Sequence, residues 1–229
     1  IRSLKNGINV ISLSATPIPR TLNLSLSKVR DISLITTPPT GRKSVKTIVS
    51  RYSKSLVFEA IQREFYRDGQ VFYLLNNVSM LEEKKKEISD RFPGKTIAFA
   101  HGQLRPKELS KVMQSFIRKE IDLLVCTTII ESGIDIENAN TLIVEESENY
   151  GLSQLHQIRG RVGRSQREAY AYFLLNETKE LKNKASERIE ALQENESLLS
   201  GFSLAMRDLE IRGAGELLGE KQSGPIDVV

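Results

Sequence analysis

The chain of 229 residues has no tryptophan, one cysteine and two histidines. Because Cys126 is the only cysteine, the chain has no disulfide framework. No second histidine or carboxylate lies at metal-ligand spacing from His101, and no cysteine cluster exists that could hold zinc. We therefore predict no metal site on this chain, and the low cysteine content favours a reducing, cytoplasmic environment.

Long apolar runs are also absent. No run approaches the roughly 20 residues that a membrane-spanning helix requires. The first residues, IRSLKNGINV, lack both a signal-peptide layout and an initiator methionine. We expect no membrane partner, and we interpret the first residue as a cut point inside a longer protein.

The composition itself is that of an ordinary globular protein. Hydrophobic residues make up 39% of the chain and charged residues 27%, and this length can bury one substantial core or two modest ones. The net charge of +4 permits nucleic-acid binding without specifying it, since a bland basic surface gives the same total. Nothing in the sequence indicates an oligomer, so we expect a monomer.

Short apolar segments alternate with longer amphipathic ones along most of the chain. We predict strands at 9–16, 71–76, 96–100, 121–128, 140–146 and 170–175, and helices at 54–68, 79–91 and 105–118. Strands that alternate with helices indicate an α/β fold, in which a parallel sheet carries helices on both faces.

Two stretches interrupt this alternation. Residues 36–45, TTPPTGRKSV, have the composition of a linker, and after Asn176 the strands give way to two predicted helices closed by glycine. We therefore divide the chain into residues 1–40, an α/β domain at 41–178, and a helical appendage at 179–229.

Three strand ends carry polar residues suited to binding an anion or a nucleic acid. VCTTIIESGIDI places Thr127 and Thr128 at the end of a strand that opens a helix, which is a natural phosphate site or an ordinary helix start. His101 follows another strand in AHGQLRPKEL, as a binding residue or a plain loop histidine. In LSATPIPR, Ser14 and Thr16 precede two prolines that a stiff turn would also explain.

The segment QIRGRVGRS, which begins at Gln157, holds Arg159, Arg161 and Arg164 close together. Like charges at this spacing repel one another, so a fixed anion is expected beside them. We expect Arg161 and Arg164 about one helical turn apart on the same side, where two guanidinium groups suit the shifting charge of a triphosphate. The alternative is a solvated basic loop.

The order of these motifs supports a family assignment. SATP, HG, TT…GID and QxxGRxGR, in this order, resemble the superfamily 2 helicases and translocases, whose motor has two RecA-like domains with ATP in the cleft between them. TPIPRTLNLSLSKVRDISLITTPP, CTTIIESGIDIENANTLIVE, GLSQLHQIRGRVGRS and DLEIRGAGELLGEKQSG are similar to the bacterial transcription-repair coupling factors. The resemblance covers nearly all of residues 10–224. The related RecG family shares the motor, but there a proline is expected where this chain has Ala214.

The resemblance assigns a role to each unit of the chain. Residues 1–40 are similar to the end of the first motor domain, 41–178 to the second RecA-like domain, and 179–229 to a translocation motif made of a helical hairpin and a loop. The implied fold is a RecA-like parallel sheet with helices on both faces, followed by that hairpin and loop.

The resemblance also implies the site residues. Arg161 and Arg164, with Gln157 and Gly160 of the same motif, would act on the phosphates of ATP bound to the first domain. The other implied positions fall into two groups. Gly133 and Asp135 would lie beside the nucleotide, and Ser14, Thr16, His101, Thr127, Thr128, Arg188, Arg212 and Gln222 would contact DNA or couple to it. Plain surface ion pairs are the alternative for Arg188, with a nearby glutamate, and for Arg212, with Glu210 or Asp208.

The implied function is that of the C-terminal motor lobe of an ATP-dependent translocase on double-stranded DNA, which displaces stalled RNA polymerase and couples transcription to nucleotide excision repair. RNA polymerase and UvrA would bind through parts of the full-length protein outside this chain, and the other partner would be the upstream RecA-like lobe. Alternatives are a RecG-like branch-migrating helicase lobe, or a non-catalytic module that binds DNA or protein.

One absence bears directly on this function. The chain has no GxxxxGK[ST] phosphate-binding loop and no DExx box for magnesium. PGKT, at 93–96, lacks the spacing and precedes a strand, whereas a phosphate-binding loop follows one. We therefore expect the phosphate and Mg²⁺ sites for ATP to lie mainly on the upstream lobe, and this chain to be inactive alone.

Overall fold

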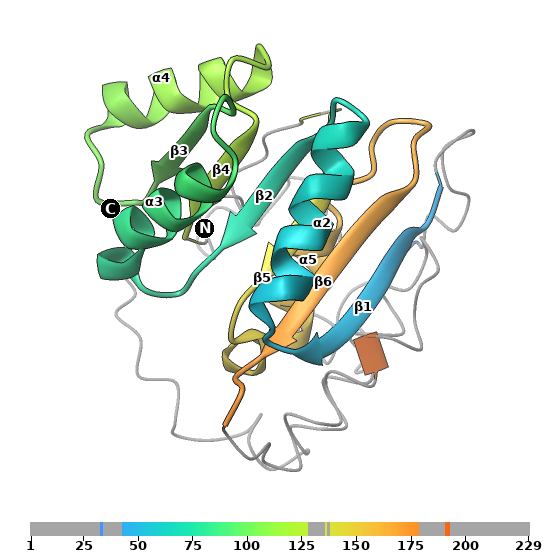
Figure 1. Cartoon of the computed structure of the whole chain (residues 1–229). Coiled ribbons are helices and arrows are strands. Elements are labelled where there is room, and N and C mark those ends of the chain that lie inside the picture. Colours follow the sequence, from blue (N-terminus) through green and yellow to red (C-terminus); the bar gives the residue numbers. More distant parts are fainter. Residues whose placement is uncertain (1–32, 34–42, 128–135, 137, 179–190, 193–229) are drawn as a thin grey trace, which may run out of the picture.

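The computed structural model describes residues 33, 43–127, 136, 138–178 and 191–192. Six strands form one sheet in the order β1-β6-β5-β2-β4-β3, and every neighbouring pair is parallel. Figure 1 shows the strands with the helices that connect them. The strands are β1 (Val45–Arg51), β2 (Gln70–Leu74), β3 (Ile97–Ala100), β4 (Leu123–Cys126), β5 (Ala139–Val144) and β6 (Ala169–Leu175). The helices are α2 (Lys54–Tyr66), η2 (Val78–Met80), α3 (Leu81–Arg91), α4 (Pro106–Ile117), η4 (Ser147–Asn149) and α5 (Leu152–Arg159).

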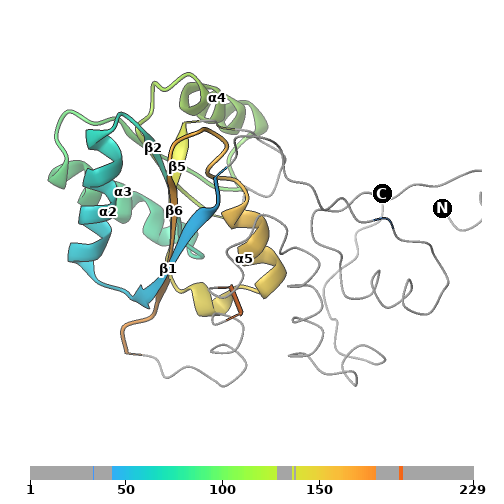
Figure 2. The ribbon, with the colours of Figure 1, turned by 90° about the vertical axis from the view of Figure 1, so that its right-hand side faces the viewer.

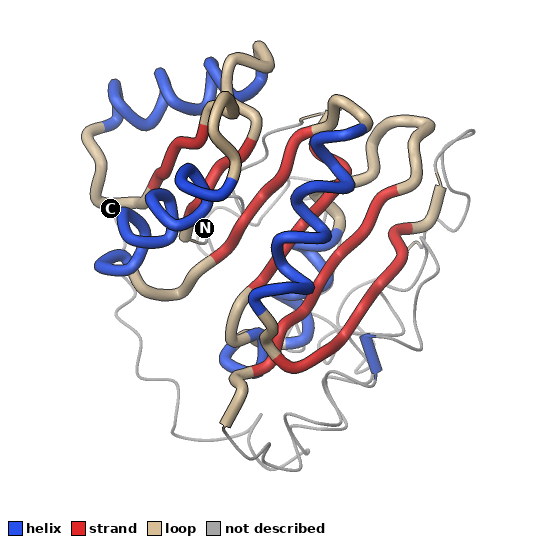
Figure 3. Tube along the Cα trace, viewed as in Figure 1, coloured by secondary structure: helices blue, strands red, loops and turns tan. Residues whose placement is uncertain are grey.

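Helices cover both faces of the sheet. On β2, Phe72 and Leu74 join the core that contains α4 and α5, whereas Val71 and Tyr73 join the core that contains α2 and α3. This separation follows from the alternation of side chains along a strand. Figure 2 views the sheet nearly edge-on, with α2 and α3 on one side and α5 on the other, and Figure 3 shows the strands side by side.

The central strands explain the continuous apolar runs of the sequence. Every residue of β2, β4 and β5 is buried, because these strands have a sheet neighbour on each edge and a helical layer on each face. A strand enclosed in this way has no polar side to alternate with. The predicted strands at 71–76, 96–100, 121–128, 140–146 and 170–175 are confirmed as β2 to β6.

The predicted helices are confirmed as well, while one strand was missed. The segments 54–68, 79–91 and 105–118 contain α2, η2 with α3, and α4. Strand β1 begins at the last residue of the predicted linker 36–45. It lies at an end of the sheet and pairs only with β6 among the described strands, so most of its residues stay partly exposed. The predicted strand 9–16 lies outside the described residues, and the division into three units stays a prediction.

The single cysteine provides a test of the packing. Cys126 is buried at the end of β4, and burial raises the pKa of its thiol because a thiolate would lose its solvation. We predict no reaction with a thiol reagent such as dithionitrobenzoate in the native protein and stoichiometric reaction in denaturant. Rapid labelling without denaturant would contradict this packing of β4.

Candidate functional site

Helix α5 leads directly into the arginine segment. Its residues Leu152, Leu155 and Ile158 are buried against the sheet at helical spacing. The helix spans Leu152–Arg159, and the N–H of Gly160, the residue after it, donates to the carbonyl of His156 at 3.0 Å. Gln157 lies half-buried on this helix, two residues before its end. The helix therefore fixes where the following residues, which we call the arginine loop (160–168), begin.

Gly163 turns the chain within the arginine loop. Its φ of +72° is a left-handed conformation that L side chains rarely adopt. A Cβ at this position would lie 2.8 Å from the Cβ of Ala169 and 3.0 Å from Cγ2 of Val45. Glycine is required here both by conformation and by space.

The position of Gly163 corrects the expected helical relation between the two arginines. The helix ends at Arg159, and Arg161 lies in the turn that follows, where its N–H donates to the carbonyl of Ile158 at 3.0 Å. Arg164 comes after the left-handed residue, so the two side chains are not one helical turn apart. Arg161 is half-buried and Arg164 is exposed.

Arg159 has a different role from the other two arginines. Its side chain is only 4% exposed, and its guanidinium donates to the hydroxyl of Thr47 at 3.2 Å and to the carbonyl of Leu192 at 3.0 Å. It therefore fastens α5 to β1 and to residue 192. The expected binding of an anion by Arg161 and Arg164 stays a prediction.

His156 completes this contact. Its Nδ1 lies 3.2 Å from the Arg159 guanidinium, which can only donate, so Nδ1 accepts and the ring is neutral. Burial, and after it the positive charge of Arg159, lowers the pKa of His156 from 6.5 to about 4.

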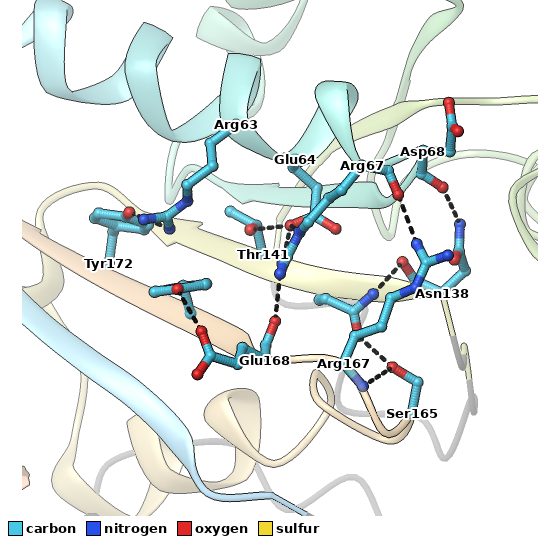
Figure 4. A network of polar contacts seen from close by, with 12 residues as sticks. Arg63, Glu64, Arg67, Asp68, Asn138, Thr141, Ser165, Arg167, Glu168 and Tyr172 are labelled. Atoms are coloured by element: carbon cyan, nitrogen blue, oxygen red, sulfur yellow. Dashed lines mark hydrogen bonds and ion pairs between the residues drawn. The ribbon is translucent and has the colours of Figure 1, made fainter.

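The arginine loop lies at the edge of the sheet where the strands begin. The N–H of Gly163 donates to the carbonyl of Ala139 at 3.4 Å, and the hydroxyl of Ser165 donates to Oδ1 of Asn140 at 2.8 Å. Both acceptors belong to the start of β5. Figure 4 shows that Arg167 and Glu168 are also linked to the turn between α2 and β2, through hydrogen bonds with Arg67.

His101 and Thr127 lie at the opposite edge, where the strands end. They follow Ala100 of β3 and Cys126 of β4, which are register partners, and the N–H of Thr127 donates to the carbonyl of Ala100 at 3.3 Å. The His101 ring stacks on Phe99 with centroids 6.1 Å apart and an interplanar angle of 2°. The structure thus brings these two residues together and separates them from the arginine loop by the length of the sheet.

The remaining predicted site residues lie outside the described part of the chain, and their assigned roles stay predictions. They are Ser14, Thr16, Thr128, Gly133, Asp135, Arg188, Arg212 and Gln222.

Sequence reasoning missed a charged cluster at the edge where the strands end. Lys84 of α3 is 8% exposed and forms an ion pair with Glu145 at 3.0 Å, while its Nζ donates to the hydroxyl of Tyr52 at 3.2 Å. Burial alone would lower the pKa of Lys84, but Glu145 and these hydrogen bonds raise it above its ordinary value. In the sequence Lys84 begins a run of three lysines, which is typical of a solvated helix face.

The described residues were compared with the requirements of a metal site and of a membrane-spanning helix. Among them, no group of three or more histidine, cysteine, aspartate or glutamate side chains could hold a metal ion. None of the described helices is long and apolar enough to cross a membrane.

The space around Gly163 gives a stability prediction. We expect Gly163→Ala to lower the free energy of unfolding by about 2–4 kcal/mol, because strain and overpacking each cost about 1–3 kcal/mol. Gly102→Ala is the matched control, since nothing lies within 4 Å of a Cβ built there. Urea denaturation of both variants measures the difference, and equal midpoints would contradict the close packing at Gly163.

The neutral His156 gives a pH prediction. Because its pKa is about 4 in the folded chain and 6.5 ordinarily, the unfolded chain binds more protons between these values. Stability is therefore fully present above about pH 6.5 and falls as the pH drops toward 4. We expect His156→Gln to flatten this decline in urea denaturation series. An unchanged slope in the variant would show that His156 does not carry the effect.

The described architecture and the whole sequence both match known proteins. The helicase conserved C-terminal domain matches residues 54–166. The chain is 52% identical over all of its 229 residues to the transcription-repair-coupling factor of Staphylococcus haemolyticus and 53% identical to that of Staphylococcus epidermidis. It spans about one fifth of the length of these curated relatives, 20% in each case.

Solved structures agree with this assignment. A structure of RecG bound to a three-way DNA junction superposes with a TM-score of 0.72 and 36% identity, covering 88% of this chain and 27% of RecG. A structure of S. cerevisiae Dbp5 bound to RNA superposes with a TM-score of 0.56 at 14% identity, covering 86% of this chain and 54% of the other, and shows the fold alone. The sheet and the sequence matches thus agree, and the chain belongs to the helicase C-terminal domains of superfamily 2, within the family of the transcription-repair-coupling factors.

Proposed function

We propose that this chain is the second motor lobe of an ATP-driven translocase on double-stranded DNA, and that it serves a transcription-repair-coupling factor in displacing stalled RNA polymerase. One observation carries the proposal. Of three neighbouring arginines, Arg159 is buried to anchor α5, while Arg161 and Arg164 leave the core on a loop fixed at one edge of the sheet. The identity of 52% over the whole chain to the Staphylococcus haemolyticus coupling factor supports the same proposal.

In this proposal Arg161 and Arg164 act on ATP that is held by the upstream lobe. A guanidinium group presents donors in a rigid fork that matches phosphate oxygens, and it stays charged at any physiological pH. Charge spreads over the phosphate oxygens during phosphoryl transfer, so donors placed in advance stabilise the transition state more than the ground state. Magnesium, when bound with ATP, would neutralise phosphate charge, and we assign its ligands to the upstream lobe.

We place DNA at the opposite edge of the sheet, beside His101 and Thr127. The N–H of Thr127 donates to the carbonyl of Ala100, and Thr127 comes directly after the end of β4. Binding sites of α/β proteins commonly lie at such strand ends. Nucleotide chemistry and DNA contact would then occupy the two ends of the same strands. The proposed coupling residues Ser14, Thr16, Arg188, Arg212 and Gln222 would link lobe closure to movement of DNA.

The chain should not hydrolyse ATP by itself. Its 229 residues contain neither a GxxxxGK[ST] loop nor a DExx box, so the groups that hold the phosphates and magnesium would have to come from the upstream lobe. We propose RNA polymerase and UvrA as partners of the full-length protein rather than of this chain.

A RecG-like branch-migrating helicase lobe is the second candidate. The RecG structure favours it with 36% identity and a TM-score of 0.72. The higher identity to the coupling factors, together with Ala214 where RecG proteins are expected to have proline, favours the first candidate. A wedge domain of OB type upstream would support RecG, and a polymerase-interacting domain would support the coupling factor.

The central prediction concerns Arg161 and Arg164. We would replace the matching fifth of the Staphylococcus haemolyticus factor with this chain and measure steady-state ATP hydrolysis with duplex DNA. We expect Arg161→Ala and Arg164→Ala each to lower kcat by about 10³-fold, the lower end of what such residues contribute. Arg118→Ala, which removes an exposed arginine just after α4, is the control and should leave kcat unchanged.

Two results would contradict the proposal. Hydrolysis by the isolated chain would show that the missing phosphate-binding loop is not needed. If neither arginine substitution changes the activity of the chimera, the arginine loop is a solvated basic loop without a role in ATP hydrolysis.

A further inference from the structure

The turn between α2 and β2, residues 67–69, lies directly against the arginine loop (Figure 4). Nη1 of Arg67 donates to the carbonyl of Glu168 at 2.7 Å, and Nη1 of Arg167 donates to the carbonyl of Arg67 at 2.6 Å. Each segment thus holds the other through a main-chain carbonyl. Such contacts fix the path of the backbone rather than one side chain.

A buried carboxylate holds Arg67 in place. Glu64 is completely buried, and its Oε2 accepts from Nε of Arg67 at 2.9 Å, from Nη2 of the same side chain, and from the hydroxyl of Thr141 at 2.5 Å. Charge-assisted hydrogen bonds of this kind are strong, and a buried charge that loses its partner is costly. Glu64 therefore ties α2, β5 and Arg67 into one unit.

Gly69 makes room for this carboxylate. A Cβ at Gly69 would lie 1.6 Å from Oε1 of Glu64, so no other residue fits beside it in this arrangement. The N–H of Gly69 also donates to the carbonyl of Glu64 at 3.0 Å. The turn is thus shaped around Glu64.

A second set of contacts fixes the loop residue that follows Arg164. The hydroxyl of Ser165 donates to Asn140, whose Nδ2 donates to the carbonyl of Asn138 at 3.1 Å. Asn138 in turn donates to the carbonyl of Asp68 at 3.1 Å. On the other side of Arg164, Gly163 is held by its N–H bond to β5. The backbone is therefore fastened immediately before and after Arg164.

We propose that Glu64 and Arg67 are positioning residues for Arg164, an inference that rests on the role of Arg164 in ATP hydrolysis proposed above. Neither touches the nucleotide. Through Glu168 and Arg167 they hold the arginine loop so that the exposed Arg164 side chain projects from a fixed backbone. A catalytic group held in advance avoids the cost of being ordered in the transition state, and a misplacement of about 1 Å can cost about 10²-fold in rate.

The test uses the same chimera with Arg67→Ala and Arg167→Ala. We expect each to lower kcat about tenfold, while the KM for ATP and the affinity for duplex DNA change less than about twofold, because only transition-state stabilisation is lost. Arg167 is exposed and lies outside the buried pair, so Arg167→Ala tests the inference even if Arg67→Ala fails to fold. Lys46→Ala is the control, since it removes an exposed 3.2 Å ion pair to the carboxylate of Glu168 but not the contact to its carbonyl.

Combining each substitution with Arg164→Ala separates positioning from general structural damage. If Arg167 acts through Arg164, Arg167→Ala has no further effect on single-turnover hydrolysis in the Arg164→Ala background. A tenfold fall that persists in that background would overturn the inference. So would unchanged kcat for Arg167→Ala and Arg67→Ala when Arg164→Ala alone abolishes activity. If Arg164→Ala itself leaves kcat unchanged, the proposed function fails and the positioning role fails with it.

Discussion

The close approach of the chain at Gly163 to the starts of β1 and β6 is the constraint on which the site depends. A left-handed residue without a side chain sits within 3.0 Å of Val45 and Ala169, measured from where its Cβ would be. This contact lets the chain leave α5, turn, and enter β6 beside β1. The same turn separates Arg164 from the helix and leaves it exposed. The packing of this edge of the sheet and the exposure of Arg164 thus both depend on the turn at Gly163.

The arginine loop and the pair formed by His101 and Thr127 lie at opposite edges of the sheet. Where the strands begin, the arginine loop is fastened to β5 and to the α2–β2 turn; where they end, His101 and Thr127 follow paired strands, and Lys84 is buried against Glu145. Six parallel strands with close-packed helices on both faces connect these edges. In the proposed motor, such a sheet would carry a displacement from one edge to the other, because its close-packed interior is not readily compressed.

Much of the fold could be predicted from local patterns, and the site only in part. Strands β2 to β6 are apolar enough to be predicted directly from the sequence. Strand β1 follows a Pro/Gly-rich stretch, and its place beside β6 depends on a pairing between residues far apart in the sequence. The three arginines look alike in sequence, and only the contacts of Arg159 with Thr47 and Leu192 distinguish it. Likewise, a glutamate such as Glu64 is expected on the exposed face of a helix. Its burial depends on Gly69 and on Thr141, which lies 77 positions away in the sequence.

The central claim is that Arg161 and Arg164 reach a nucleotide bound on another lobe. The most direct measurement is a structure of the complete two-lobed motor with duplex DNA and a non-hydrolysable ATP analogue. The account predicts guanidinium nitrogens of both arginines at about 3 Å from phosphate oxygens, with the arginine loop in the conformation described here. A closed, nucleotide-bound motor in which both guanidinium groups point into solvent would contradict it.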